Sequence, residues 1–173
     1  APPVHPAIST TPVAQGRILL AAPRAWVDDA TDGAALHQLI AARPFIGLED
    51  QMSIGSLVGQ TLSRGGLAPA STLEVQTYSL ARSLVEEGLG VTMLDQFTAA
   101  TGSMDRIALF ALEPAQAFEV RAMRAEHHAP SSLADSLVEC FAEAARALSE
   151  DLPQRLQPTP FVLAPSGDDA DAD

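Results

Sequence analysis

Polar side chains gather at three places in the sequence where an apolar run ends and a helical pattern begins. These places are Glu49 to Ser53, Thr77 to Ser79 and Asp95 to Thr98. A helix N-terminus presents unpaired N–H groups and a partial positive charge, so hydroxyls and amides beside it can bind a carboxylate or another small polar group. These residue types therefore favour the binding of a small molecule.

Ser53 is the strongest candidate for a ligand contact. Its hydroxyl and the N–H groups of the helix start could together hold a carboxylate, although a serine at this position is also an ordinary N-cap. Glu49 and Asp50 could pair with a ligand ammonium or guanidinium group, but acidic residues before a helix also suit the helix dipole. Both interpretations stay open for these three residues.

The other two loops offer different contacts. Gln96, Phe97 and Thr98 supply an amide, an aromatic ring and a hydroxyl, as amino-acid pockets do, and the alternative is a plain helix start with Phe97 in the core. At the second loop, the candidate contacts are a weaker group that consists of Gln76, Thr77 and Tyr78. If the strands before the loops are parallel, all three loops lie at one edge of a sheet and line one cleft.

The sequence contains no coherent cluster for catalysis or for metal binding. Gly55-Ser56-Leu57-Val58-Gly59 is not a hydrolase nucleophile elbow, because its serine directly follows the first glycine inside an amphipathic helical pattern. His127 and His128 are adjacent, so they cannot present two ligands to one metal from a single helical face. Cys140 is expected to be a small buried filler. We therefore expect no enzyme activity, no cofactor and no metal.

Composition limits the class of protein further. The 173 residues fit one domain or two small lobes that share a hinge. A hydrophobic content of 47% with 18% charged residues predicts a globular chain, and no apolar run is long enough to span a membrane. The net charge of −12 would repel a phosphate backbone, so this chain alone should not bind DNA. Its N-terminus has neither a Met nor a secretion signal, which indicates a truncated or processed chain, and its single cysteine fits a reducing cytoplasm.

Hydrophobic periodicity divides the chain into strands and helices. Ala1 to Gly16 contains four prolines and is expected to be extended irregular chain. The alternation from Phe45 to Leu94 predicts parallel strands joined by helical crossovers in an open α/β sheet. We expect strands at 17–22, 45–48, 72–76, 91–94, 106–112 and 118–123, and helices at 34–42, 53–63 and 79–87.

A long helix is expected to close the fold. Ser131 or Ser132 can cap it, and apolar residues from Leu133 to Leu148 form a stripe at helical spacing. After Asp151, the prolines and the acidic C-terminus predict a disordered tail, in which residues 161–163 could dock onto the domain.

Five stretches stand in an informative order along the chain. They are Arg43-Pro44-Phe45-Ile46-Gly47-Leu48, Leu62-Ser63-Arg64-Gly65-Gly66-Leu67-Ala68-Pro69, Ser83-Leu84-Val85-Glu86-Glu87-Gly88-Leu89-Gly90-Val91, Asp95-Gln96-Phe97-Thr98-Ala99 and Ala129-Pro130-Ser131-Ser132-Leu133. The third is the most specific and is similar to an "LVxxGLGV" motif, in which glycines let a helix end tightly before a strand. Together they resemble the effector-binding domain of LysR-type transcriptional regulators, especially members that sense opines or basic amino acids.

The resemblance implies a periplasmic-binding-protein-like α/β fold, in which an open sheet carries helices on both faces and two lobes are present, one of them incomplete. Residues 1–16 would lead in from the first lobe, 17–120 would form the second lobe with its hinge strands, 121–150 would return a strand and a helix to the first lobe, and 151–173 would be the tail. A small effector, such as an amino acid or an opine, would bind between the lobes.

The resemblance also implies how the chain would act. Effector binding would control the geometry of a DNA-bound, cytoplasmic homo-oligomer, with DNA contacted only through a helix-turn-helix domain that this sequence lacks. The helix at 53–63 is the candidate contact between subunits, unless its apolar stripe only covers its own sheet; the stripe consists of Ile54, Leu57, Val58 and Leu62.

Two other functions share this architecture. A solute-binding protein of a transporter has the same two-lobed fold, and the missing export signal counts against it. An enzyme on this fold would need a nucleophile, a base or a metal cluster, which we do not find.

Overall fold

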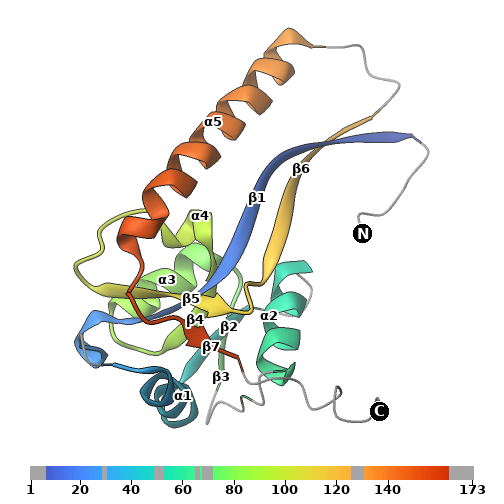
Figure 1. Cartoon of the computed structure of the whole chain (residues 1–173). Coiled ribbons are helices and arrows are strands. Elements are labelled where there is room, and N and C mark those ends of the chain that lie inside the picture. Colours follow the sequence, from blue (N-terminus) through green and yellow to red (C-terminus); the bar gives the residue numbers. More distant parts are fainter. Residues whose placement is uncertain are drawn as a thin grey trace, which may run out of the picture.

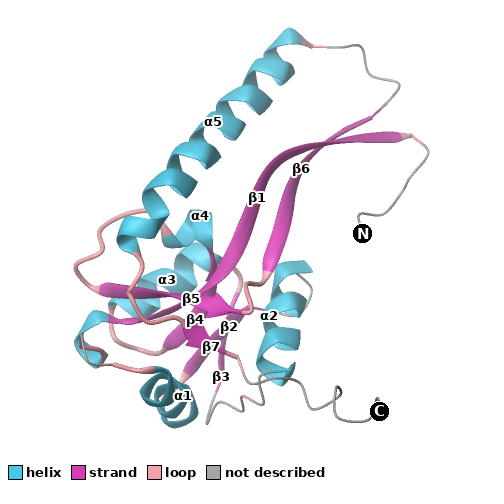
Figure 2. Ribbon diagram, in the orientation of Figure 1, coloured by secondary structure: helices cyan, strands magenta, loops and turns pink. Residues whose placement is uncertain are grey.

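A computed structural model of the chain describes residues 7–28, 31–48, 53–64, 67, 72–125 and 131–163 (Figure 1). Helices cover both faces of a central mixed β-sheet (Figure 2). The strands are β1 (Ile8–Pro23), β2 (Phe45–Leu48), β3 (Thr72–Val75), β4 (Val91–Asp95), β5 (Ile107–Glu113), β6 (Ala117–Ala125) and β7 (Phe161–Val162). The helices are the short 3-10 turn η1 (Arg24–Trp26), α1 (Gly33–Ala42), α2 (Ser53–Arg64), α3 (Tyr78–Glu86), α4 (Gln96–Ala99) and α5 (Ser132–Arg155).

The sheet combines parallel and antiparallel pairs. Its strand order is β3-β2-β4-β1-β5-β7. Strand β2 pairs in parallel with β3 and β4, as the alternation of strands and helices predicts, whereas β1 is antiparallel to both β4 and β5. The carboxyl ends of β2, β3 and β4 therefore face one edge of the sheet, where the loops with the polar residues begin.

Strand β1 supplies the centre of the core. Its segment from Ile18 to Ala22 is completely buried, because neighbouring strands flank it and helices cover both faces. Successive side chains of a strand point to opposite faces, so Ile18 and Leu20 join a cluster with α1 and α2, while Leu19 joins a cluster with α3 and the end of α5. The predicted sheet with helices on both faces is thus present.

The first half of β1 corrects the sequence prediction. Residues Ile8 to Gly16 are not irregular chain but one strand of a long antiparallel ribbon, in which Ile8 pairs with Ala125 and Arg17 with Ala117. A register shift between Pro12 and Ala14 accommodates the proline. We call the paired segments 8–17 and 117–125 the ribbon; together with α5 it extends away from the sheet (Figure 1).

The end of the chain also differs from the prediction. Helix α5 continues to Arg155, through Pro153. The segment from there to residue 163 is ordered, which corrects the predicted disordered tail. Phe161 is completely buried and β7 pairs in parallel with β5, so residues 161–163 dock onto the domain. Cys140, expected to be buried, is exposed on α5. Residues 164–173 lie outside the described part.

Candidate functional site

A cavity of about 690 Å³ lies between the ribbon, α5 and the helices α3 and α4. This volume is within the range of roughly 300–1,000 Å³ that is typical of small-molecule sites. The ribbon contributes Val13, Ala14, Val120, Arg121, Ala122 and Met123; α3 and the α4 region contribute Ser79, Phe97, Thr98 and Thr101; and α5 contributes Leu137, Val138, Phe141, Ala144, Ala145 and Leu148. The walls are mainly apolar, and the polar groups come mostly from α3 and α4.

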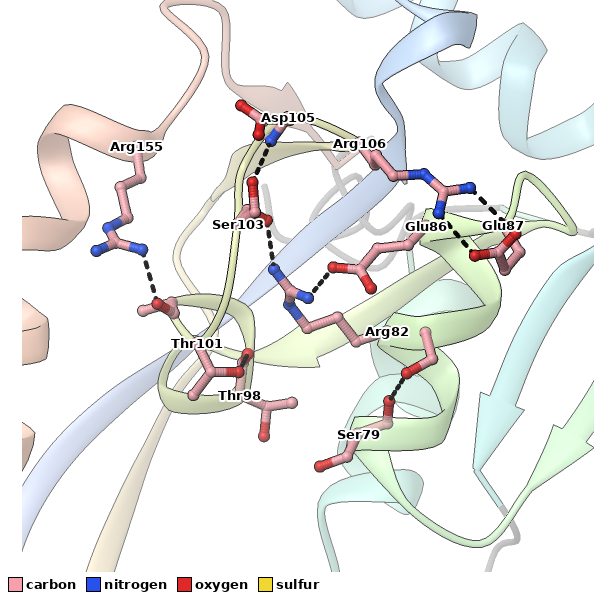
Figure 3. A network of polar contacts seen from close by, with 12 residues as sticks. Ser79, Arg82, Glu86, Glu87, Thr98, Thr101, Ser103, Asp105, Arg106 and Arg155 are labelled. Atoms are coloured by element: carbon pink, nitrogen blue, oxygen red, sulfur yellow. Dashed lines mark hydrogen bonds and ion pairs between the residues drawn. The ribbon is translucent and has the colours of Figure 1, made fainter.

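Three residues that carry hydroxyl groups line this cavity on the side of α3 and α4. They are Ser79, Thr98 and Thr101, whose positions on α3 and around α4 are seen in Figure 3. Thr101 Oγ1 donates a hydrogen bond of 2.7 Å to the backbone carbonyl of Thr98, which fixes its side chain. The arrangement can bury an apolar ligand body against α5 and orient a polar end by hydrogen bonds to hydroxyls.

Arg121 is the charged residue among those that line the cavity. It forms an ion pair with Glu119 on the same strand, and its Nη1 donates to Thr10 Oγ1 at 3.0 Å. The nearby carboxylate offsets the positive charge, so this wall attracts an anionic ligand group less than an unpaired arginine would.

Asp95 positions the residues of α4. Its Oδ1 accepts hydrogen bonds of 3.0 Å from the backbone N–H groups of both Phe97 and Thr98. Phe97 in turn packs edge-on against Phe118 of the ribbon, with ring centroids 6.1 Å apart. A short helix of one turn is therefore held at its start by a carboxylate and against the ribbon by an aromatic pair.

A buried arginine connects α3 to the loop after α4. Arg82 pairs with Glu86 on the next turn of α3, and its Nη2 donates to the carbonyl of Ser103 at 2.9 Å (Figure 3). Gly102 has a φ of 70° and leaves space for the guanidinium, because a Cβ there would lie 3.3 Å from Arg82 Nη1. These contacts hold the hydroxyl-bearing segments of α3 and α4 in a fixed arrangement.

Tyr78 stands next to Ser79 at the start of α3. Its hydroxyl is buried and has no hydrogen-bond partner in the described part of the chain. Burial, and to a smaller extent the carboxylate of Asp95, raise the pKa of Tyr78 above its ordinary value. The phenol is therefore neutral at physiological pH, and Tyr78 is not among the residues that line the cavity.

Of the predicted site residues, some line the cavity and others use their side chains for hydrogen bonds within the fold. Phe97 and Thr98 line the cavity. Thr77 uses its hydroxyl as the N-cap of α3, accepting from Leu80 N at 3.2 Å. Gln96 is buried, and its amide binds Arg17 N and Ser149 Oγ, so both of these hydrogen bonds are internal.

The predictions for the first loop and for α2 are described only in part. Glu49 and Asp50 lie outside the described residues, and so do the side chains of Ser53, Ile54 and Leu57. Val58 is buried in the core of its own chain, and Leu62 packs against the same hydrophobic cluster. These contacts within the chain agree with the alternative interpretation that the stripe covers its own sheet, and the subunit contact stays a prediction.

Sequence reasoning missed most of the cavity walls. The apolar stripe of α5 predicts a helix that closes the fold, whereas its cavity-lining residues Leu137 and Phe141 are 56% and 62% exposed. Ser79 lay inside a predicted loop, yet Thr77 was preferred there. The sequence carries no signal that singles out Ser79, because which side chain of the loop lines the cavity depends on tertiary contacts.

Comparison with known proteins places this geometry in a family. Residues 1–146 match the family model described as the LysR substrate binding domain. The chain belongs to this family. HTH-type transcriptional regulator DgcR from Pseudoalteromonas sp is 27% identical over 137 residues, which cover 79% of this chain and 47% of DgcR.

Solved structures share the fold. HinK, a LysR family transcriptional regulator from Pseudomonas aeruginosa, superposes with a TM-score of 0.59 at 17% identity, covering 83% of this chain and 50% of HinK. The CcmR regulatory domain from Synechocystis, described in complex with 2-PG, gives a TM-score of 0.58 at 12% identity, covering 80% of this chain and 67% of that domain. The expected periplasmic-binding-protein-like α/β fold is therefore confirmed.

This LysR-type effector-binding chain spans about half the length of DgcR and of HinK. Its relatives are transcriptional regulators rather than enzymes. In the described part of the chain, no helix is long and apolar enough to cross a membrane.

Proposed function

We propose that this chain is the sensing part of a LysR-type transcriptional regulator, and that a small effector of the amino-acid or opine class binds in the cavity between the ribbon, α5 and α3/α4. The observation that carries the proposal is the cavity of about 690 Å³, in which the hydroxyls of Ser79 and Thr98 meet apolar walls. The reported complex of the CcmR domain with 2-PG supports small-molecule binding by this fold.

The chemistry of the cavity suggests how such an effector is held. The aliphatic part of an amino acid or opine would be buried against α5 and the ring of Phe97, while a carboxylate or amide would accept hydrogen bonds from Ser79 and Thr98. Ser53 and Glu49 remain predicted contributors, Ser53 for a carboxylate and Glu49 for a cationic group.

The exposed apolar face of α5 supports an incomplete first lobe. Leu133, Leu137 and Phe141 are 79%, 56% and 62% exposed, which is unusual for large apolar side chains that follow one helix face. We infer that the remaining part of a longer protein completes this lobe over α5 and the ribbon. A helix-turn-helix domain in that part would bind DNA, which this chain with a net charge of −12 would repel.

The regulatory step follows from differential binding. An effector that contacts both α4 on the sheet side and α5 on the other side stabilises one arrangement of the two lobes, and it shifts their equilibrium only by its difference in affinity for the two states. In a homo-oligomer bound to DNA, this shift would change the spacing of the DNA-binding domains.

Thermal-shift screening followed by calorimetry tests the proposal. Arginine, lysine, ornithine and opines are titrated into the chain, and at least one is expected to raise the melting temperature. The Ser79→Ala and Thr98→Val variants should then bind about 5–13-fold more weakly, because each loses one hydrogen bond worth roughly 1–1.5 kcal/mol.

Ser136→Ala is the matched control, because Ser136 is an exposed serine on α5 that does not line the cavity. It should bind the effector as the unmodified chain does. If no compound of this class stabilises the chain, or if Ser79→Ala and Ser136→Ala bind equally well, the proposed site is wrong.

A further inference from the structure

A buried amide lies where the ribbon joins the sheet. Gln96, the first residue of α4, is 4% exposed. Its Oε1 accepts a hydrogen bond of 3.1 Å from the backbone N–H of Arg17, and its Nε2 donates one of 2.8 Å to Ser149 Oγ. One side chain therefore connects three elements that are far apart in the sequence.

Arg17 marks the change in the pairing of β1. Arg17 is the last residue of β1 that pairs with β6, opposite Ala117, and Ile18 is the first that pairs with β4, opposite Asp95. From Ile18 and Leu19 onward β1 is flanked by β4 and β5 instead of β6, so the ribbon leaves the sheet at this point. The Gln96 carbonyl binds the backbone at this point.

Ser149 connects the same amide to α5. Its hydroxyl accepts from Gln96 and donates to the carbonyl of Ala145 at 2.8 Å, one turn earlier in the helix. A second hydrogen bond joins α5 to the other end of α4, because Arg155 Nη1 donates to the carbonyl of Ala100 at 2.8 Å (Figure 3). Helix α5 is thus attached to both ends of the single turn of α4.

We propose that Gln96 is a positioning residue that clamps the ribbon and α5 to α4, and so fixes the angle at which they leave the sheet. Both hydrogen bonds of its amide cross between the sheet side and the projecting side, and a buried amide that lost one of them would leave a polar group without a partner. This side chain thus joins the sheet to the projecting elements, in addition to the continuous strand β1 and the bond between Arg155 and Ala100.

The clamp lies directly beside the cavity. Phe97 and Thr98, which follow Gln96 in α4, line the cavity, and Ser149 follows its lining residue Leu148. A ligand that displaces α4 would therefore change the bonds to Arg17 and Ser149 at the same time. This regulatory meaning rests on the proposed effector-binding function, whereas the clamp itself can be measured without an effector.

Distance measurements between spin labels test the clamp in the full 173-residue chain. One label is attached to Cys140, the single cysteine, which is exposed on α5, and the other to Ala41→Cys on the exposed side of α1. Ser149→Ala removes only the link to α5, and Gln96→Leu removes both links with little change in side-chain size.

Two control variants accompany them. Gln154→Leu replaces an exposed amide on the same helix, and Val75→Ala lowers stability at β3, an outer strand of the sheet, without touching the clamp. Neither should alter the distance distribution. Ser149→Ala should broaden and shift it, Gln96→Leu should do so further, and the Arg17 amide in Gln96→Leu should exchange hydrogen about tenfold faster.

The result that overturns the proposal is a distribution in Ser149→Ala as narrow, and centred at the same distance, as in Gln154→Leu. If Gln96→Leu fails to fold, Ser149→Ala alone decides. The distance measurement uses no effector, so a screen in which no amino acid or opine binds does not change what it says about the clamp. A variant with a broadened distance distribution but normal effector binding would show that the clamp and the proposed effector site are independent.

Discussion

Replacing Phe161 by alanine is expected to destabilise the whole domain, although the residue lies in a proline-rich C-terminal segment. Its ring is completely buried, packs 4.6 Å from the ring of His37 on α1, and belongs to the core cluster around Ile18. Its strand is held by Leu163 N donating to the carbonyl of Glu113 at 2.7 Å. His37 Nε2 also donates to the carbonyl of Val162, at 2.8 Å.

The magnitude follows from the buried surface. A phenylalanine buries roughly 150–250 Å² at about 25 cal/mol/Å², which corresponds to about 4–6 kcal/mol. Truncations of buried phenylalanines cost about 3–5 kcal/mol. Because the segment can detach when its anchor is removed, the loss is limited to the free energy of docking, and we expect Phe161→Ala to lower the free energy of unfolding by about 3 kcal/mol.

Urea denaturation followed by circular dichroism measures this loss, with Val162→Ala as the neighbouring control. The Val162 side chain is 48% exposed and should cost less than about 1 kcal/mol when truncated. Deleting residues 157–173 should cost at least as much as Phe161→Ala. Equal stability of the Phe161 and Val162 variants would refute the reasoning, because the segment would then contribute no core packing.

Two further predictions concern packing and charge. In thermal denaturation, Gly90→Ala should lose about 1–3 kcal/mol of stability, because its Cβ would lie 2.6 Å from the carbonyl oxygen of Pro44. Gly59→Ala in helix α2 should gain up to about 1 kcal/mol, because no atom lies within 4 Å of its Cβ and alanine favours the helix. A stability change of the same sign in both variants would contradict this reasoning. Arg106 holds the pKa of Glu87 below its ordinary value through a hydrogen-bonded ion pair. Because the pKa is lowered in the folded state, the pair favours folding above the ordinary glutamate pKa and loses this effect as the pH falls through the lowered value. In an NMR titration, Arg106→Gln should return the pKa of Glu87 to its ordinary range, and an unchanged titration curve would show that the pair does not form in solution.

Local sequence determined most of the lobe around the parallel strands. Hydrophobic periodicity and helix-ending residues act over a few neighbours, so the strands at Phe45 and Val91 and the helices between them could be predicted closely. One glycine of the family motif has a local reason, because Gly88 adopts a φ of 75° at the end of α3. Gly90 has a tertiary reason, because a Cβ there would lie 2.6 Å from the carbonyl oxygen of Pro44.

The candidate site was predictable in its place but not in its members. Parallel topology indicates that the loops after β3 and β4 meet at one edge, and Ser79 and Thr98 do line one cavity. Which side chain of each loop faces the cavity depends on contacts that the sequence does not reveal. Gln96 and Thr98 look equivalent as polar residues, yet only the first finds internal partners, at Arg17 and Ser149.

Three features depend on contacts between distant segments and are seen only in the tertiary structure: the ribbon, the docked C-terminal segment and the clamp. Ile8 pairs with Ala125, and Phe161 is placed beside Leu112. Backbone hydrogen bonds and burial between such distant segments carry no periodic signal in either partner, and prolines nearby hide the pattern further. The sequence by itself indicated the family, the α/β lobe and its polar edge, because these depend on local patterns. The tertiary structure brings two of the three polar loops, those after β3 and β4, to one cavity together with the ribbon and α5.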